Sequence, residues 1–175
     1  MSLPMSAARA VTEVVNRCES AKNTGYLDLS SCSLMCIADG VYMKLKDHEI
    51  TKINIQNNAL KKFPKKLLNK FPNTIIFNIE GNQLTEFPEE LAEWTSMKGF
   101  SAANNQVEKF PEGVFAMSEL TILDLSGNRI KNFDARKLFE SCPQLKQLNL
   151  AGNPLEEKVV ALLSEKKQDL VLKLE

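Results

Sequence analysis

The strongest constraint on the fold is a repeated pattern, apolar-x-x-apolar-x-apolar-x-x-Asn/Cys-x-apolar, which occurs six times along the 175 residues. The fifth copy runs from Leu120 through Leu123, Leu125 and Asn128 to Ile130. The steps between successive Asn or Cys positions are 26, 24, 23, 23 and 25 residues, and these positions are Cys32, Asn58, Asn82, Asn105, Asn128 and Asn153. Six matches in register indicate one structural unit stacked six times.

The middle of each copy alternates inward apolar and outward polar residues, which is the pattern of a short strand. One unit cannot bury its apolar face alone, whereas stacked units can. We therefore expect an α/β leucine-rich-repeat-type solenoid with six short parallel strands on its concave face and helical caps at both ends. A single domain should cover residues 1–175, with an N-terminal capping helix over 1–23, the repeats over 24–155 and a C-terminal cap over 156–175.

The recurring Asn has a structural explanation. The chain turns inward after each strand, and the turn leaves buried N–H and C=O groups that an amide side chain can pair. We expect a ladder of these amides, with Cys32 as a small core residue in the first repeat. A second pattern begins three residues after the last position of the first, and it predicts a packed apolar spine. Its residue pairs are Ile37-Ala38, Phe63-Pro64, Phe87-Pro88, Phe110-Pro111 and Phe133-Asp134. After them, Leu67, Leu91 and Val114 should return to the core.

The form Leu123-Asp124-Leu125-Ser126-Gly127-Asn128 and the Phe-Pro-x-x-Leu return resemble the 23-residue class of leucine-rich repeats, found in intracellular signalling proteins of the Ras-suppressor type. The resemblance covers residues 24–155. It implies an intracellular protein with a role in signalling. The sequence departs from the class at Ala38 and Asp134, where the class favours proline.

Both ends carry helical patterns that would close the solenoid. At the N-terminus, Ser6 is a candidate N-cap, Arg9, Glu13 and Arg17 should face solvent, and the core-facing stripe should be Ala7, Val11, Val14, Val15, Cys18 and Ala21. At the C-terminus, Glu156 and Glu157 open a second helix, Lys166 and Lys167 close it, and its apolar residues are Val159, Val160, Leu162 and Leu163. Leu170, Leu172 and Leu174 predict a last extended piece, with a partner-binding tail as the alternative.

The 22 basic residues balance the 22 acidic ones, so no overall field attracts a polyanion. The one basic cluster is Lys61, Lys62, Lys65, Lys66 and Lys70, and aligning the repeats predicts the pairs Lys62–Glu86, Lys65–Glu89 and Lys66–Glu90. We therefore expect no nucleic-acid partner.

No apolar stretch approaches the roughly 20 residues of a membrane span, so we expect no membrane partner either. Without an apolar leader, and with four cysteines, the chain is expected to be cytoplasmic with free thiols, the nucleus being the alternative.

Catalytic and metal-binding patterns are not found in the sequence. The single histidine, His48, has no partner in the sequence pattern, and Cys32 and Cys36 lack the second ligand pair of a zinc site. We expect no catalytic residues, no metal and no cofactor.

The remaining candidate is the concave face. Its central row should be Asp28, Asn54, Asn78, Ser101, Asp124 and Asn149, and the row two residues earlier Tyr26, Lys52, Ile76, Gly99, Ile122 and Gln147, with Ile75 beside Ile76. All of these except Asp28 are our candidate partner-binding residues. Two outward isoleucines flank Gly99, and a small apolar patch rimmed by polar residues marks interaction sites. The alternative is that the isoleucines are β-formers shielded by their neighbours.

We therefore expect a monomeric scaffold or adaptor that binds another protein through this face. The alternative is a regulatory subunit that inhibits or localises a signalling enzyme, in a GTPase or phosphatase pathway as the family resemblance allows. Six strands about 4.8 Å apart make a face only about 24 Å long, so binding should be weak or shared with loops at one edge.

Overall fold

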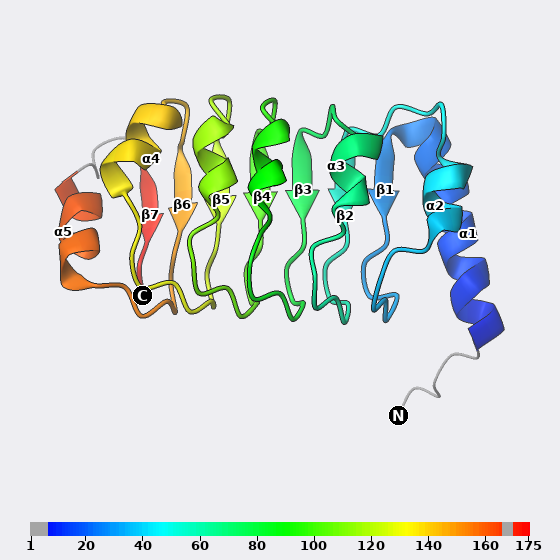
Figure 1. The fold of residues 1–175 in the computed structure, drawn as a ribbon, viewed down its shortest axis with the longest axis horizontal. Helices are drawn as coiled ribbons and strands as arrows, with labels where there is room; N and C mark the ends of the chain where they lie inside the picture. Colours follow the sequence, from blue (N-terminus) through cyan, green and yellow to red (C-terminus); the bar gives the residue numbers. More distant parts are fainter. Residues whose placement is uncertain (1–6, 166–169) are drawn as a thin grey trace.

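The computed structural model describes residues 7–165 and 170–175, which form one parallel sheet with helical segments along one side of it (Figure 1). The strands lie in chain order from β1 to β7. They are β1 (Tyr26–Asp28), β2 (Lys52–Asn54), β3 (Ile76–Asn78), β4 (Gly99–Ser101), β5 (Ile122–Asp124), β6 (Gln147–Asn149) and β7 (Val171–Lys173). This confirms the α/β leucine-rich-repeat solenoid. The predicted number of strands was one too low, because the extended piece near the C-terminus pairs with β6 as a seventh strand.

One helix, α1 (Ala7–Thr24), precedes β1, and each of the other helical segments connects two successive strands along one side of the sheet. Within the described residues, the connecting α-helices are α2 (Asp39–Lys44), α3 (Lys66–Lys70), α4 (Ala135–Ser141) and α5 (Glu157–Glu165). Two further connecting segments are 3₁₀ helices, η1 (Glu89–Glu93) and η2 (Glu112–Ala116). These short 3₁₀ helices lie in the 23-residue repeats. A repeat of this length leaves few residues between one strand and the next, so its return segment holds only a short helix.

Proline is not needed to bring the chain into these helices. Pro88 has φ −74° and ψ 153°, and Ala38 takes nearly the same conformation with φ −65° and ψ 146°. Asp134 is also extended, and its carboxylate accepts a hydrogen bond from the Lys137 N–H at 2.9 Å. Asp134 is therefore the N-cap of α4, a role that the proline favoured by the class could not fill.

The inward residues of the strands form the core, in which the central residue of every strand from β1 to β6 is almost fully buried: Leu27, Ile53, Phe77, Phe100, Leu123 and Leu148. The predicted spine packs as two aromatic pairs, since the ring centroids of Phe63 and Phe87 are 5.7 Å apart and those of Phe110 and Phe133 are 4.3 Å apart. Leu67, Leu91 and Val114 are fully buried, as predicted.

The turn after each strand needs a left-handed residue, which the sequence reasoning missed. The third residue after each strand from β1 to β6 has positive φ, from 54° at Ser31 to 71° at Gly152, and the others are Asn57, Gly81, Asn104 and Gly127. Glycine and asparagine are the residues that tolerate this conformation best. At Gly81 and Gly127 glycine is favoured for a second reason, because a Cβ would collide with the side-chain amide of the preceding repeat's Asn57 or Asn104 unless that amide moved.

The N-terminal end differs from its prediction. In α1, Cys18 and Ala21 are buried against the first repeat, but Val11 is 64% exposed and Val15 is 39% exposed. Only the C-terminal half of α1 packs along β1, and the N-terminal half extends past it (Figure 1). Glu13 and Arg17 were expected to face solvent, and they are instead partly buried. Ser6, the side chain of Ala7, Lys166 and Lys167 lie outside the described residues.

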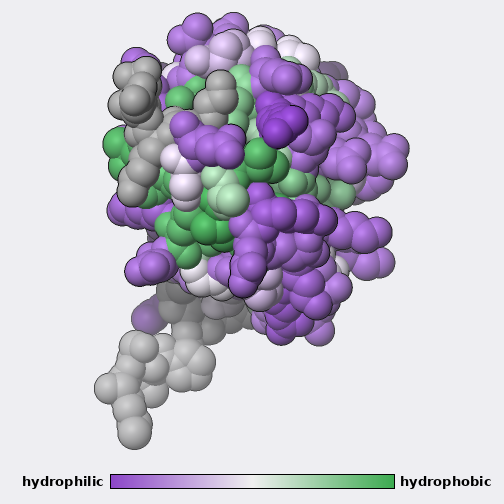
Figure 2. Space-filling model, turned by 90° about the vertical axis from the view of Figure 1, so that its left-hand side faces the viewer, coloured by the Kyte–Doolittle hydropathy of each residue, from purple (hydrophilic) through white to green (hydrophobic). Residues whose placement is uncertain are grey.

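At the other end, α5 forms over the predicted segment and buries Val159 and Leu163. It covers the end of the solenoid only in part. Viewed from this end, hydrophobic surface remains visible among the polar residues (Figure 2). The residues packed there against the core are only partly buried, among them Leu155, Leu162, Leu172 and Leu174.

Candidate functional site

The sheet face is the side of the sheet that points away from the helices, and it carries two rows of side chains. The first row is Tyr26, Lys52, Ile76, Gly99, Ile122, Gln147 and Val171, and the second row is Asp28, Asn54, Asn78, Ser101, Asp124, Asn149 and Lys173. The strand register therefore brings together all the candidate binding residues except Ile75. Ile75 precedes β3, is half-buried, and accepts backbone hydrogen bonds from Lys98 and Gly99.

The centre of the first row is apolar. Ile76 and Ile122 are 43% and 45% exposed, and Gly99 is paired between them. A Cβ added to Gly99 would lie 3.9 Å from Ile76 Cγ1, an ordinary contact, and Gly99 does not have positive φ. Val171 on β7 adds a further exposed apolar side chain, and a shallow hollow of about 190 Å³ lies over β5, β6 and β7. The sheet face thus offers apolar contact at its centre and toward β7.

The second row has a structural role that the sequence reasoning missed. The Asp124 Oδ1 atom accepts a hydrogen bond from the backbone N–H of Ser126 at 2.9 Å, so the side chain satisfies the N–H two residues after its own position. The same arrangement occurs at Asp28, Asn54, Asn78 and Asn149. These are Asx turns that end each strand. No such bond is found for Ser101 in the described part of the chain.

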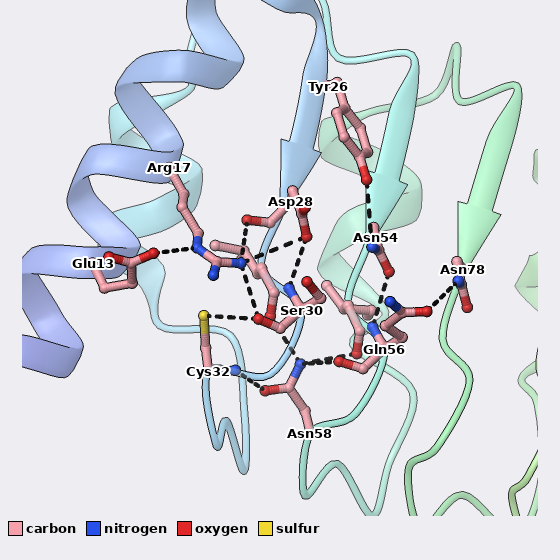
Figure 3. A network of polar contacts seen from close by, with 12 residues as sticks. Glu13, Arg17, Tyr26, Asp28, Ser30, Cys32, Asn54, Gln56, Asn58 and Asn78 are labelled. Atoms are coloured by element: carbon pink, nitrogen blue, oxygen red, sulfur yellow. Dashed lines mark hydrogen bonds and ion pairs between the residues drawn. The ribbon is translucent and has the colours of Figure 1, made fainter. Parts of the chain in front are cut away.

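The remaining polar atoms of this row link the repeats to one another. Asn54 Nδ2 donates to the hydroxyl oxygen of Tyr26 at 3.3 Å, and Asn78 Nδ2 donates to Gln56 Oε1 at 2.8 Å (Figure 3). Farther along, Asn149 Nδ2 donates to Asp124 Oδ2 at 2.9 Å. Since much of the polar capacity of the second row is used within the protein, the first row is the better source of binding energy.

A separate network closes the free edge of β1. Arg17 of α1 donates from Nε to Glu13 at 2.7 Å and from Nη1 to the carbonyl oxygens of Asp28 and Ser30 (Figure 3). The hydrogen bond to Glu13 is the main cause that raises the pKa of the guanidinium above its usual value. Arg17 therefore anchors the cap helix to the first strand.

The recurring asparagines pair backbone groups between repeats. Asn105 Oδ1 accepts from the N–H of Leu84 at 3.0 Å, and its Nδ2 donates to the carbonyls of Ile79, Ala102 and Ala103. Asn58, Asn82 and Asn128 make the corresponding bonds, and the N–H of Cys32 donates to Asn58 Oδ1. Asn153 donates to two carbonyls, those of Leu125 and Leu150. These five asparagines are therefore occupied within the fold.

The titratable groups do not form a reactive cluster within residues 7–165 and 170–175. His48 is exposed, and its Nδ1 lies 3.0 Å from the carbonyl oxygen of Lys46. Burial raises the pKa of the Cys142 thiol to about 11 and also raises the pKa of Cys18 and Cys32. Such thiols are poor nucleophiles. The described side chains contain no group of three His, Cys, Asp or Glu residues able to hold a metal ion.

The comparisons with known proteins agree with this fold. The sequence model of the family described as "Leucine rich repeat" matches residues 102–155. Tsukushi of Gallus gallus is 29% identical over 142 residues, which are 78% of this chain and 37% of Tsukushi. The chain therefore spans well under half the length of this curated relative.

Two solved structures illustrate the likeness. A leucine-rich repeat protein of Leptospira interrogans has a TM-score of 0.68 and 19% identity, over 79% of this chain and 34% of that one. The ectodomain of the Arabidopsis thaliana membrane receptor kinase GASSHO1/SCHENGEN3, solved in complex with CASPARIAN STRIP INTEGRITY FACTOR 2, has a TM-score of 0.57 and 21% identity, over 71% and 15% of the two chains. The structures show the fold, and with the family match they support the leucine-rich repeat family.

The leucine-rich repeat fold commonly mediates protein–protein interaction. Stacking of the repeats joins their strands into one extended sheet surface. The family model that matches describes a repeat and indicates no catalytic family. Among the helices of the described residues, none combines the length and the apolar composition that crossing a bilayer requires.

Proposed function

We propose that this protein is a non-catalytic interaction scaffold or adaptor, and that its sheet face binds another protein. The observation that carries this proposal is the pair Ile76 and Ile122, which are nearly half exposed on either side of Gly99. Apolar side chains on a solvent-facing sheet contribute nothing to the core, whereas a partner that covers them gains about 25 cal/mol per Å² of buried apolar area. The complex between the similar receptor ectodomain and its factor is consistent with protein binding by this fold.

The shape of the sheet face limits the strength of binding. Seven strands about 4.8 Å apart give a face only about 29 Å long, which is small beside the roughly 800 Å² per partner of a standard interface. The proposed complex is therefore of moderate affinity, or the partner also touches the loops at one edge of the sheet. Tyr26 and Val171, exposed at the two ends of the first row, are the residues an extended partner would reach.

A pair of glycine substitutions tests the proposal. Gly99→Arg places a long cation between the two isoleucines, while Gly40→Arg adds the same side chain on α2, where a Cβ meets open space. Both proteins, with wild type, are used to capture partners from cell extract, and the captured proteins are quantified by mass spectrometry. We expect Gly40→Arg to retain the wild-type partners and a folded Gly99→Arg to lose at least nine tenths of them. Equal capture by both variants would place the binding site elsewhere.

The identity of a captured partner separates scaffold from regulator. A GTPase or phosphatase whose activity changes on addition of wild-type protein, but not of Gly99→Arg, would favour the regulatory subunit over the scaffold. A partner without enzymatic activity would favour the scaffold.

We also propose that the chain works as a monomer inside the cell, in the cytoplasm or the nucleus, as the resemblance to the 23-residue intracellular class implies. Cys18, Cys32 and Cys142 are buried and unbridged, and Cys36 is exposed. Protein isolated from cells without reductant should titrate four thiols after denaturation, and should run as a monomer in analytical ultracentrifugation. Two thiols, or a stable dimer, would contradict the proposal.

A further inference from the structure

A groove of about 490 Å³ lies away from the sheet face, between the return segments of the first two repeats. Its floor is made by apolar side chains that are each less than a tenth exposed, namely Ile37, Tyr42, Leu60 and Phe63. One wall is Met35, which is 80% exposed. A methionine in this position has no core to fill, and its flexible thioether side chain can adapt to whatever enters the groove.

The charged part of the lining is mostly basic. It carries Lys61, Lys62, Lys65 and Lys66, and among the described residues Asp39 is the one acidic residue that lines the groove. Asp39 is already paired, because the Lys66 Nζ atom lies 2.6 Å from its Oδ1 atom. We call this feature the lysine-rimmed groove.

The lysines of the groove do not pair as the repeat alignment predicts. Lys65 binds Glu90 at 2.7 Å rather than Glu89, and Lys66 binds Asp39 of the preceding repeat rather than Glu90. Both long side chains reach diagonally across the surface, so the alignment misassigned their partners. In the described part of the chain, Lys62 forms no ion pair with Glu86, and Lys61 also forms none. Two consecutive lysines of the groove lining therefore have no carboxylate partner among the described residues.

We propose that the lysine-rimmed groove binds a short acidic peptide segment of a partner protein. One apolar side chain of the peptide packs beside Met35 over the apolar floor, and carboxylates on its flanks pair with Lys61 and Lys62. The charge of the site selects the partner, because the rim presents two unpaired cations while its only carboxylate is occupied. An acidic segment gains from both cations, and a basic segment is repelled.

Two other classes of partner fit the groove less well. An anionic membrane attracts each lysine near its surface only weakly, so two unpaired lysines would give only weak attachment. Single-stranded nucleic acid needs exposed aromatic rings on which bases stack, whereas Tyr42 and Phe63 lie in the floor with at most 8% exposure. The recessed apolar floor next to the cations is a feature that suits a peptide.

The test uses two defined sets of twelve-residue peptides. Every peptide has one central Leu, Ile, Met or Phe, and four Glu or Asp residues at varied flanking positions. The second set is identical except that Lys replaces each acidic residue. Binding is followed through the methyl resonance of Met35 in protein labelled with ¹³C-methyl methionine, and affinities are measured by fluorescence anisotropy. We expect acidic peptides to shift the Met35 resonance with micromolar affinity, and lysine peptides to leave it unchanged.

A matched pair of variants tests the role of the cations. K61E/K62E reverses both rim charges, and K109E/K131E makes the same charge change at exposed lysines elsewhere on the solenoid. The acidic peptides should bind at least tenfold more weakly to K61E/K62E, with no loss for K109E/K131E. Melting temperatures show whether both variants are folded, and Met35→Ala, which keeps the lysines, provides a second variant expected to weaken binding severalfold.

Several results would overturn the proposal. It fails if no acidic peptide moves the Met35 resonance at 1 mM, or if acidic and lysine peptides bind equally. Binding of phosphatidylserine vesicles, but of no peptide, in a manner that K61E/K62E abolishes would assign the groove to a membrane. A Met35 shift that depends on protein concentration alone would assign it to a second copy of this chain. Because these readouts are independent of Gly99, they leave the sheet-face proposal untouched.

Discussion

Arg17 gives the Ser30 carbonyl oxygen a hydrogen bond that the backbone of a preceding repeat would otherwise give. Its Nη1 atom donates to this oxygen at 2.9 Å and to the carbonyl oxygen of Asp28 at 3.2 Å. In the second repeat, the corresponding carbonyls of Asn54 and Gln56 accept from backbone N–H groups of the first repeat. The same pairing recurs in the third to sixth repeats. One guanidinium group thus replaces two backbone donors at the edge of β1.

Replacing Arg17 should therefore destabilise the whole solenoid from its N-terminal end. Arg17→Leu leaves two carbonyls without their donor, and because the site is only partly buried we expect a loss of about 1 to 2 kcal/mol. Urea unfolding followed by the fluorescence of Trp94, the single tryptophan, which is fully buried, measures this loss. Arg17→Lys should lie in between, because one ammonium group cannot reproduce the planar set of donors.

Arg129→Leu is the control for this prediction, since Arg129 is exposed and its loss should change stability by less than about 0.5 kcal/mol. If Arg17→Leu and Arg129→Leu unfold at the same urea concentration, Arg17 does not close the edge of the sheet.

The asparagine ladder should contribute strongly to stability. Asn105→Ala removes the acceptor of the Leu84 N–H and the donor to three carbonyls, and each buried group left unpaired costs about 1 to 3 kcal/mol. We expect a total loss of at least about 2 kcal/mol in urea unfolding. The exposed Asn73→Ala is the control, and similar stability of the two variants would refute the ladder.

The left-handed turn predicts a cost for a single methyl group. Gly127 has φ 64°, and the side chain of Asn104 occupies the place where its Cβ would lie. Gly127→Ala should lose at least about 1 kcal/mol from the backbone conformation alone, and more from the collision. The double variant N104G/G127A removes the collision and should recover part of the loss. A double-mutant cycle without coupling would show that the two residues do not interact.

Buried Cys142 predicts a loss of stability at alkaline pH. Burial raises the pKa of this thiol to about 11 in the folded protein, from an ordinary value of 9.0. Between these values the unfolded thiol ionises while the folded one keeps its proton, so the unfolded state binds fewer protons and stability falls as pH rises. The fall should be at most about 1.4 kcal/mol per pH unit from this group.

Cys142→Ala checks this pH dependence. Urea unfolding at pH 8, 9.5 and 10.5 should show a smaller decrease for the variant than for wild type, whatever the other titrating groups contribute to both. Parallel curves for the two proteins would mean that Cys142 is not shielded from ionisation in the folded state.

The repeats were predictable because their period makes every copy a check on the others. The positions of Leu125 and Asn128 recur in each repeat. The repeated pattern therefore predicts the strands, the core residues and the pairing of the asparagine side chains with the backbone. The sheet-face rows follow from the same alternation. The sequence of these rows does not reveal that Asp124 and its equivalents end the strands with Asx turns. An outward polar residue occupies the same position in the repeat whether its side chain binds a partner or its own backbone.

The ends and the long surface side chains were not predictable in this way. Arg17 and Val11 lie on a helix that matches no other segment of the chain, so helical periodicity alone could not tell which part of α1 touches β1. The ion pairs of Lys65 and Lys66 depend on the direction in which each long side chain extends. Each side chain can reach a carboxylate other than the one that the repeat alignment places beside it. Residues 171–173 lack the repeat's Asn, so their pairing in register with β6 depends on packing that only the structure reveals.

Photo-crosslinking inside cells tests the proposed sheet-face interaction most directly. Benzoylphenylalanine is placed at Ile122, at the centre of the sheet face, and in a control protein at Glu112, on the exposed helical side in η2. We predict that ultraviolet light links a protein partner to position 122 and not to position 112, and that adding Gly99→Arg abolishes the adduct. Adducts at position 112 with none at position 122 would show that the partner binds the helical side, and would contradict the account.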